Sequence, residues 1–257
     1  MTRLKNHHPS LRPGKQTFLA YRPNTNALMK SINSASRPLS LIFLPPQIFP
    51  KMPTISFIFF ALLIIALRIQ SSLGAAKVRE FEIVNSCTYT VWLVTPIASF
   101  ALESQVSTSV DLPTGEHGRL WARTGCHNST GKFVCWTGDC GSGDVACYGR
   151  EASAATYVEF DLNDDENGPD FYDVSLVDGY NVPVSMVPQG GDGSTCVASG
   201  CIFNVTDACP SELRVGGACQ GACDAFNTSR YCCTGGTVCG PTNYSAIFKK
   251  ACPRASS

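Results

Sequence analysis

The chain has 257 residues, with 20 basic and 20 acidic side chains and a formal net charge of zero. These charges are unevenly distributed, because residues 1–76 hold nine of the basic residues and no acidic one, which leaves residues 77–257 with a net charge of −9. An acidic folded region argues against a nucleic-acid partner, since nucleic-acid-binding proteins replace the counterions of phosphates with a basic face. We therefore expect no nucleic-acid partner.

The N-terminal 76 residues differ in composition from the rest of the chain. Residues 1–51 mix Pro, Ser, Asn, Lys and Arg without a period, so we expect a disordered extension that takes no part in the fold. Residues 52–76 contain a run of 13 mostly apolar residues, Ile55 to Leu67, followed by small residues. This run is too short for a membrane span of roughly 20 residues and is typical of a secretory signal peptide. We predict a mature chain that begins between Ala75 and Glu80 and has no stable membrane span.

A signal peptide that starts at residue 52 has two interpretations. The residues before it are either an upstream in-frame extension that is not normally translated, or part of an arginine-rich, acid-free organellar presequence. We favour the first interpretation, because an organellar stroma would not usually maintain a large set of disulfides.

All 14 cysteines lie between Cys87 and Cys252. Such a density in one acidic region indicates an oxidising compartment and a domain that is cross-linked by disulfides. Four N-glycosylation sequons agree with passage through the secretory route, and they begin at Asn128, Asn204, Asn227 and Asn243. We therefore expect a secreted glycoprotein.

Alternating apolar residues predict several short strands after residue 80. The pattern is present at Phe81–Ile83, Tyr89–Leu93 and Val106–Leu112, and again at Val158–Leu162 with Tyr157, Glu159 and Asp161 on the opposite face. Short strands separated by turn signals are typical of a β-sandwich or a flattened barrel. One helix is predicted over Asn243–Ala251, where apolar residues recur at helical spacing and two lysines lie near the C-terminal end.

The segment from Gly131 to Cys147 (GKFVCWTGDCGSGDVAC) contains three cysteines, several glycines and few apolar residues. It would bury too little surface to form a packed strand or helix, so we expect its order to come from cross-links. Zinc is the alternative, but the segment lacks a CxxC pair and a nearby metal-type histidine pair. We therefore predict disulfides in this segment, with no metal ion and no cofactor.

The same segment resembles the signature of the thaumatin family, and the likeness extends from Phe81 to Pro253. The signature positions are present as Gly131, Phe133, Cys135, Thr137, Gly138, Asp139, Cys140, Gly143 and Cys147. The resemblance implies an all-β fold, a thaumatin-like flattened β-sandwich with disulfide-rich loop lobes and little helix. It also implies that the domain at 77–257 divides into a core sandwich at about 80–123 and 150–203, a small loop lobe at about 124–149 and a disulfide-rich lobe at about 204–252.

The chain departs from full-length members of the family at its C-terminal end. Those members continue into a segment with an aspartate, two cysteines and a closing strand, whereas this chain stops at Ser257. Position by position, the resemblance implies the bridges Cys126–Cys135, Cys140–Cys147, Cys201–Cys252, Cys209–Cys219, Cys223–Cys232 and Cys233–Cys239. Cys87 and Cys196 would then be left unpaired, and the sandwich would have an open edge.

The resemblance further implies an acidic cleft, which one arginine, one glutamate and three aspartates line in the family. The matching positions are Arg119, Glu159, Asp173 and Asp178, and the last aspartate has no match. Asp173 and Asp178 are five residues apart, so a regular strand would turn them to opposite faces, and both can reach one cleft only through a bend or bulge. Trp121 shares a strand face with Arg119 and would offer an aromatic ring.

Crowded carboxylates raise one another's pKa, which leaves a protonated acid beside an ionised partner, as glycoside hydrolysis requires. Glu159 is the candidate acid, and Asp178 is the candidate base or nucleophile. The alternative is a solvated acidic surface that pairs with Arg119 and serves solubility or the fold. Some members of the family are weak endo-β-1,3-glucanases and many bind β-1,3-glucan. The missing final aspartate favours binding over hydrolysis in this chain.

The resemblance thus implies a plant pathogenesis-related protein with an antifungal, stress-responsive role, which contacts β-1,3-glucan or another fungal cell-wall polysaccharide through its acidic cleft. We expect a monomer that is secreted to the apoplast or cell wall, or delivered to the vacuole. The alternatives are a weak endo-β-1,3-glucanase, a non-defence member of the family, and an inactive truncated form.

Overall fold

The computed structural model of the chain describes residues 10–11, 16–20, 77–165, 168–189, 197–202, 204–233 and 240–257, with the backbone alone for the first two ranges. Most of its regular structure is strand. The strands are β1 (Ser10–Leu11), β2 (Gln16–Ala20), β3 (Val78–Asn85), β4 (Val91–Val94), β5 (Ser99–Leu102), β6 (Ser107–Pro113), β7 (His117–Thr124), β8 (His127–Ser129), β9 (Lys132–Val134), β10 (Tyr157–Asp161), β11 (Asp170–Ser175), β12 (Gly179–Tyr180), β13 (Val184–Pro188), β14 (Ser199–Cys201), β15 (Arg214–Val215) and β16 (Ala218–Gln220).

Within the described residues, the helices are short and lie in the C-terminal part. They are the 3-10 helices η1 (Val205–Ala208) and η2 (Ser211–Leu213) and the α-helices α2 (Ala222–Phe226), α3 (Ser229–Cys232) and α4 (Asn243–Ala251). The predicted all-β class with little helix is therefore confirmed. Within the described ranges, no helix has the length and apolar content needed to cross a bilayer.

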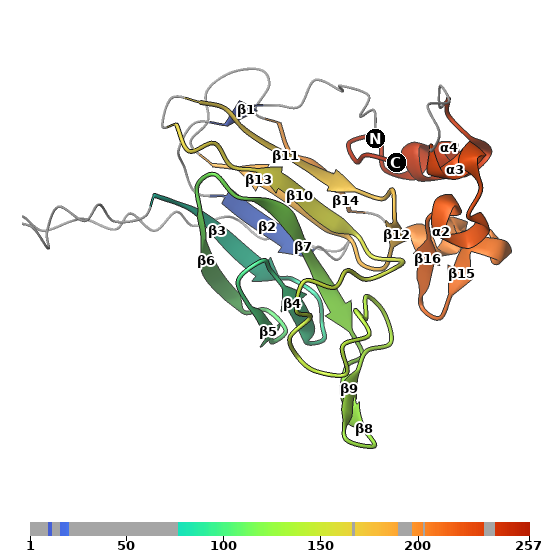
Figure 1. Cartoon of the computed structure of the whole chain (residues 1–257), viewed down its shortest axis with the longest axis horizontal. Helices are drawn as coiled ribbons and strands as arrows, with labels where there is room; N and C mark the ends of the chain where they lie inside the picture. The colour runs from blue at the N-terminus through green and yellow to red at the C-terminus, as the bar shows by residue number, and fades with distance from the viewer. Residues whose placement is uncertain are drawn as a thin grey trace, which may run out of the picture. The chain divides into compact units, whose positions relative to one another are not determined.

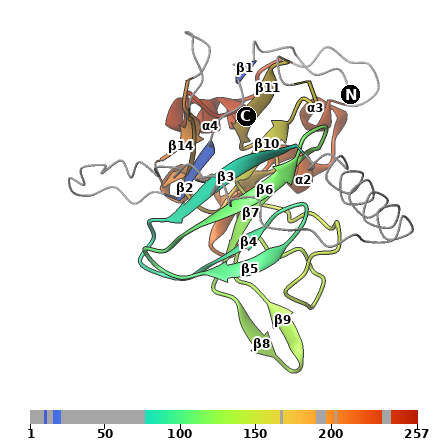
Figure 2. The same cartoon turned by 90° about the vertical axis from the view of Figure 1, so that its left-hand side faces the viewer.

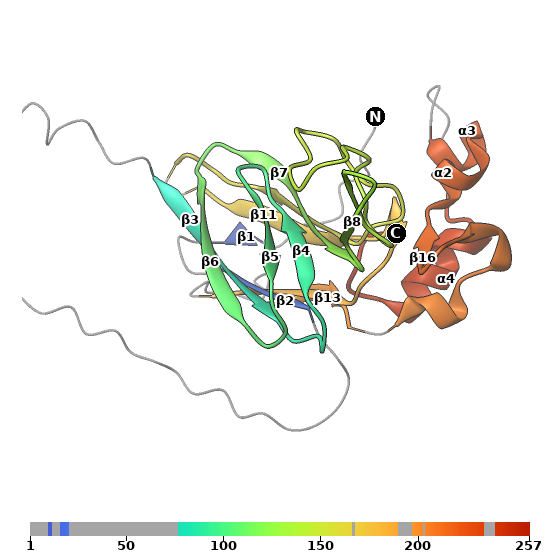
Figure 3. The ribbon, with the colours of Figure 1, turned by 90° about the horizontal axis from the view of Figure 1, so that it is seen from below.

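Two sheets form the sandwich (Figures 1 and 3). One sheet has six strands in the order β1-β11-β10-β7-β4-β5, and the other has five in the order β14-β13-β2-β3-β6. Their facing side chains make one core, in which Phe81 of β3 and Phe160 of β10 place their ring centroids 5.3 Å apart. The alternation of apolar residues along each strand directs one face into this core and the other toward solvent.

A buried ion pair also joins the two sheets. Arg79 of β3 donates from Nε to Asp170 of β11 at 2.7 Å, and the two side chains are only 5% and 0% exposed. The second oxygen of Asp170 accepts the backbone N–H of Asn163 at 2.8 Å. Both charges are therefore paired and hydrogen-bonded, which is the condition under which charges can be buried.

The predicted strands and helix lie close to their observed positions. The alternating pattern at 157–162 corresponds to β10, and the patterns near Phe81 and Val110 correspond to β3 and β6, although Tyr89 precedes the start of β4. The helix over Asn243–Ala251 is confirmed with the predicted bounds. Thr242 caps it by accepting the N–H of Ser245, whose hydroxyl accepts the N–H of Thr242 in return.

The expectation that residues 1–51 take no part in the fold is wrong for two short segments. Strand β1 pairs with β11, and β2 lies inside the five-stranded sheet between β13 and β3. Figure 2 shows β1 beside β11 and β2 beside β3. The physical reason is that β2 supplies backbone hydrogen-bonding groups to two strands that would otherwise face each other across an unfilled gap. The predicted signal peptide at 52–76 lies outside the described residues.

The segment 131–147 is ordered partly by a strand, contrary to the expectation that it could not form one. β9 (Lys132–Val134) pairs with β8 in a two-stranded hairpin. The ring of Phe133 is only 7% exposed and contacts the ring of Trp92 with centroids 4.7 Å apart, while the Arg123 guanidinium lies 5.1 Å from its centroid. One aromatic residue therefore anchors a hairpin whose other strand residues are exposed, apart from the half-buried Val134.

Five disulfides lie within the described residues, and they join the cysteines that the resemblance paired. They are Cys126–Cys135, Cys140–Cys147, Cys201–Cys252, Cys209–Cys219 and Cys223–Cys232. Cys233 is also disulfide-bonded, while Cys239 and Cys196 lie outside the described residues. Cys87 is 4% exposed and belongs to none of these five bridges, and its backbone N–H donates to Asn85 at 3.0 Å.

Candidate functional site

The predicted site residues lie on one face of the six-stranded sheet. Arg119 of β7 is the direct cross-strand partner of Glu159 of β10, and Glu159 is the direct partner of Asp173 of β11. Residues that pair directly across antiparallel strands share a face, with Cβ atoms about 5 Å apart. Register alone therefore aligns one cation and two carboxylates in a row across three strands.

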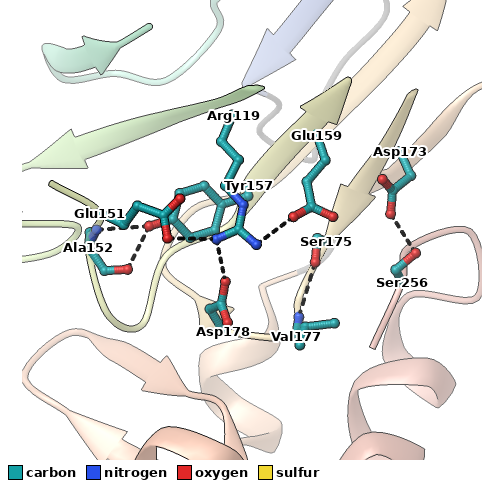
Figure 4. Close-up of polar contacts among 10 residues, drawn as sticks. All are labelled: Arg119, Glu151, Ala152, Tyr157, Glu159, Asp173, Ser175, Val177, Asp178 and Ser256. Carbon is teal, nitrogen blue, oxygen red and sulfur yellow. Dashed lines mark hydrogen bonds and ion pairs between the residues drawn. The ribbon is translucent and has the colours of Figure 1, made fainter. Parts of the chain in front are cut away.

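Arg119 collects three carboxylates on its guanidinium (Figure 4). Its Nη2 lies 2.8 Å from Glu159 Oε1, and its Nη1 lies 2.9 Å from Asp178 Oδ2 and 3.0 Å from Glu151 Oε2. The side chains of Arg119, Glu159 and Asp178 are 31%, 24% and 30% exposed. We call Arg119, Glu151, Glu159, Asp173 and Asp178 the acidic cluster. Ion pairs to Arg119 hold three of its carboxylates, which remain partly exposed to solvent.

The ring of Tyr157 packs against Arg119, and Trp121 packs against Tyr157. The guanidinium lies 4.8 Å from the ring centroid of Tyr157, which is fully buried and exchanges hydrogen bonds with the backbone of Ala152 at 2.6 and 2.8 Å. Trp121 packs edge-on against Tyr157 and donates to the carbonyl of Gly138 at 3.1 Å. Since Trp121 is only 5% exposed, the expectation that it offers a ring to a ligand is wrong. The alternation along β7 predicts the face of the sheet on which Trp121 lies, but neighbouring loops cover its ring.

Asp178 reaches the cluster because β11 ends at Ser175 and the chain then turns. The carbonyl of Asp178 accepts the N–H groups of Ala154 and Gly221, each at 3.1 Å. The next residue, Gly179, has a φ of +127°, and an added Cβ there would lie 2.3 Å from the carbonyl oxygen of Cys219. Only glycine suits this position. The turn supplies the bend that Asp173 and Asp178 need if both are to lie on one side of the sheet.

Asp173 lies in the row but does not contact Arg119. Its Oδ2 instead accepts the hydroxyl of Ser256 at 2.5 Å (Figure 4). Ser256 is held beside β11 by backbone hydrogen bonds to Val174 and Leu176. The C-terminal residues therefore provide a neutral partner for the one carboxylate that the arginine does not bind.

The electrostatics of the cluster disfavour the ionised form of Glu159. Burial raises the pKa of Glu159 above its ordinary value, the nearby charges of Asp173 and Asp178 raise it further, and Arg119 offsets part of this increase. For Arg119, burial lowers the pKa, but the carboxylates of Glu159, Asp178 and Glu151 raise it more, so the net change is upward. Arg119 therefore stays positively charged, and the pKa of Glu159 lies above its ordinary value.

Two acidic residues of this region were missed by the sequence prediction. Glu151, in an irregular segment, provides a third carboxylate, which accepts a hydrogen bond from Arg119. Asp224, on α2, is close enough for the charge of Asp178 to add to the effect of burial in raising its pKa. Neither residue has a periodic sequence signal. Asp224 places a further carboxylate from the disulfide-rich C-terminal segment near the cluster.

A pocket of about 860 Å³ lies away from the acidic cluster. Its lining includes Tyr89, Trp92 and Trp136, and Trp136 is 69% exposed. No member of the acidic cluster lines it.

In the described part of the chain, no group of three or more His, Cys, Asp or Glu residues is arranged to hold a metal ion. The carboxylates of the acidic cluster can accept hydrogen bonds and exchange protons around a fixed cation.

The fold and the site define a class of protein: all-β domains that are cross-linked by disulfides and carry an acidic cluster around one arginine. The model of the thaumatin family matches residues 85–257. The chain therefore belongs to the thaumatin family.

Named relatives resemble most of the chain. A Prunus avium protein named glucan endo-1,3-beta-glucosidase is 45% identical over 207 residues, which cover 72% of this chain and 84% of that protein. Pathogenesis-related thaumatin-like protein 3.2 of Cryptomeria japonica is 44% identical over 186 residues, which cover 70% of this chain and 79% of that protein. The solved structure of the thaumatin-like xylanase inhibitor TLXI aligns with 30% identity and a TM-score of 0.34, covering 44% of this chain and 82% of that one.

Proposed function

We propose that this protein is an extracellular defence protein that binds β-1,3-glucan of the fungal wall through the acidic cluster. The observation that carries the proposal is the anchoring of three partly exposed carboxylates on one guanidinium. Ionised carboxylates only accept hydrogen bonds, and the hydroxyls of a glucan are donors. Because the ion pairs fix the carboxylates in advance, a sugar would meet acceptors that lose little freedom on binding.

Binding is favoured over hydrolysis by the way the carboxylates are held. Glycoside hydrolysis needs one protonated acid and one separate base or nucleophile. Here the two candidates, Glu159 and Asp178, are both tied to the same guanidinium at 2.8 and 2.9 Å. The two carboxyl groups are thus held together on one cation rather than set apart as a separate acid and base. Solvent-exposed acceptors can still contribute to binding without any proton transfer.

A second candidate function is weak endo-β-1,3-glucanase activity, with Glu159 as acid and Asp178 as base or nucleophile. Two observations favour it: the raised pKa of Glu159, and 45% identity to a protein named glucan endo-1,3-beta-glucosidase. A raised carboxylic pKa is the usual property of a general acid.

Secretion and glycosylation are part of the proposal. Disulfides of this number are typical of proteins from oxidising compartments, and five bridges lie within the described residues. All four sequon asparagines have exposed side chains, namely Asn128, Asn204, Asn227 and Asn243. Mass spectrometry of the secreted protein would give the occupied sequons and the first residue of the mature chain.

The central experiment measures binding to insoluble β-1,3-glucan and sugar release from laminarin in parallel. Asp178→Asn keeps the shape of the side chain but removes a charged acceptor, so we expect affinity to fall by about 10- to 100-fold. Asp161→Asn is the matched control, because Asp161 is an exposed aspartate of β10 outside the cluster. Trp136→Ala tests the pocket instead.

The outcomes separate the hypotheses. Loss of binding in Asp178→Asn but not in Asp161→Asn or Trp136→Ala supports the acidic cluster. Loss in Trp136→Ala alone would move the site to the pocket and overturn the proposal. Sugar release that disappears in Glu159→Gln while binding persists would make the protein a glucanase.

A further inference from the structure

The N-terminal strand β2 occupies an interior position in the five-stranded sheet. It runs parallel to β3, with Phe18 at the register position of Ile83, and antiparallel to β13, with Phe18 at the register position of Met186. Residues 16–19 have a register partner on both sides. Figure 2 shows β2 in blue beside β3, although 57 residues separate Ala20 from Val78 along the chain.

β2 is the link that makes these strands one sheet. In the order β14-β13-β2-β3-β6, the pairs β13–β14 and β3–β6 are joined through β2. Without it, the sheet would become two separate two-stranded ribbons. Such ribbons are at best marginally stable in water when isolated, whereas three or more strands with an apolar face can be stable.

The gap that β2 fills cannot close by a simple shift of its walls. Neighbouring strands are about 4.8 Å apart, so one missing strand leaves β3 and β13 about 10 Å apart. Ile83 of β3 and Met186 of β13 are each only 1% exposed in the shared core. Closing the gap would pull these side chains out of their packing, which costs free energy in a close-packed interior.

Both walls are also fixed from their outer sides. β3 pairs with β6 from Val78 to Val84. β13 pairs with β14 (Ser199–Cys201), whose Cys201 is bridged to Cys252. An empty gap would therefore keep its width and present two unpaired rows of backbone N–H and C=O groups, which is a template for strand addition.

We propose that the gap between β3 and β13 is a strand-acceptor site and that residues 16–20 of the same chain are its donor strand. The site takes an extended segment that runs parallel to β3 and carries an apolar residue at the register position shared by Ile83 and Met186. Backbone hydrogen bonds on both sides supply affinity, while orientation and the apolar register position supply selectivity.

The proposal concerns the chain that keeps its N-terminus. Cleavage between Ala75 and Glu80 would separate β2 from the rest of the domain, so a chain processed there would lack its own donor. The proposed glucan site lies on the other sheet and the loops beside it, so the two proposals can fail independently.

The test compares two substitutions at Thr17 in the full chain. Thr17→Pro removes a backbone N–H inside the sheet, whereas Thr17→Val keeps it and retains a β-branched side chain. Hydrogen exchange is measured at residues 16–20, at Ile83 and at Met186. We expect Thr17→Pro to lower protection at Ile83 and Met186 by about 100-fold, because a proline in the middle of a sheet removes a ladder hydrogen bond and is poorly accommodated there. Thr17→Val should leave protection within about threefold of the unmodified chain.

A second measurement remains informative if Thr17→Pro does not fold. A protease site is inserted into the full chain between residues 24 and 76, and the folded protein is cleaved there. We expect the N-terminal fragment to co-elute with the domain as a one-to-one complex of monomer size. Exchange of residues 16–20 at unprotected rates, release of the fragment on cleavage, or equal protection in both Thr17 variants would each overturn the proposal. A dimer with protected β2 would also overturn it, because the donor would then belong to a second copy.

Discussion

Arg119 and Glu159 are direct cross-strand partners on β7 and β10, and their side chains form an ion pair of 2.8 Å. Despite this cation, the pKa of Glu159 is raised, because its burial and the charges of Asp173 and Asp178 outweigh the attraction to Arg119. The folded protein therefore holds the ionised form of Glu159 at a cost. A group kept under such conditions is a candidate for binding or catalysis.

We expect Glu159→Gln to weaken glucan binding without lowering stability at neutral pH. A raised pKa means that the surroundings disfavour the charged form, so a neutral amide removes an unfavourable contribution. The free energy of unfolding should rise or stay within about 1 kcal/mol, since Glu159 is partly exposed. Urea titration at pH 7 measures the stability, and pull-down on β-1,3-glucan measures the binding.

The stability of the Glu159→Gln variant should also depend on pH differently from that of the unmodified chain. Folded Glu159 keeps its proton at a pH where the unfolded chain, with a pKa of about 4.3, has lost it. The folded state then binds more protons, so the contribution of Glu159 to stability falls as the pH rises above about 4.3. Glu159→Gln should flatten this part of the stability curve. An unchanged curve would contradict the raised pKa.

Replacing Arg119 by methionine should destabilise the acidic cluster in a pH-dependent way. The change leaves Glu151, Glu159 and Asp178 without their shared cation. We expect a loss of about 1–2 kcal/mol at pH 7, because each partly exposed pair contributes little alone but three share one group. The loss should shrink as the pH falls toward about 4, because the pKa of Glu159 is raised and its charge is neutralised there. Arg119→Lys is the control, since it keeps the charge but lacks the planar guanidinium. Its free energy of unfolding should lie between those of the unmodified chain and Arg119→Met.

Much of the candidate site follows from the sequence because its geometry is strand geometry. Alternation predicts β10 and therefore the side of the strand on which Glu159 lies, and the resemblance adds Arg119. Antiparallel register then brings the two together. Helix α4 is likewise predictable, because its apolar spacing and its C-terminal lysines are local signals.

Other features depend on contacts that no local pattern encodes. Glu151 lies in an irregular segment, and the neighbouring Ala152 is held by the hydroxyl of Tyr157. The burial of Trp121 depends on loops that are distant in sequence. Strand β2 has a short and ambiguous pattern, and its partners begin at Val78 and Val184, far along the chain. Non-local pairing of this kind is decided by the fold as a whole.

Asp170→Asn tests the ion pair that joins the two sheets. The change leaves the buried guanidinium of Arg79 without its charged partner, and that side chain is only 5% exposed. We expect the free energy of unfolding to fall by about 3–5 kcal/mol. The double variant Arg79→Met with Asp170→Leu removes both charges and should recover most of this loss. Equal destabilisation in the single and double variants would show that packing, not charge pairing, dominates at this position.

Gly179→Ala should damage both stability and the acidic cluster, because this glycine holds the turn that presents Asp178. An alanine Cβ would lie 2.3 Å from the carbonyl oxygen of Cys219 and 2.9 Å from the Cα of Ala154, in a backbone conformation with a φ of +127°. Since these are backbone atoms, the turn itself must move. We expect a loss of more than about 3 kcal/mol in the free energy of unfolding, together with weaker glucan binding.

Gly141→Ala is the matched control for this prediction. Gly141 also has a positive φ, of +66°, but an added Cβ there would meet nothing within 4 Å. Its substitution therefore measures backbone strain without a collision, and we expect a loss of about 1 kcal/mol with glucan binding intact. Denaturant midpoints and glucan pull-down distinguish the two variants. If both lose the same stability and both still bind glucan, the turn at Gly179 does not position Asp178 for binding.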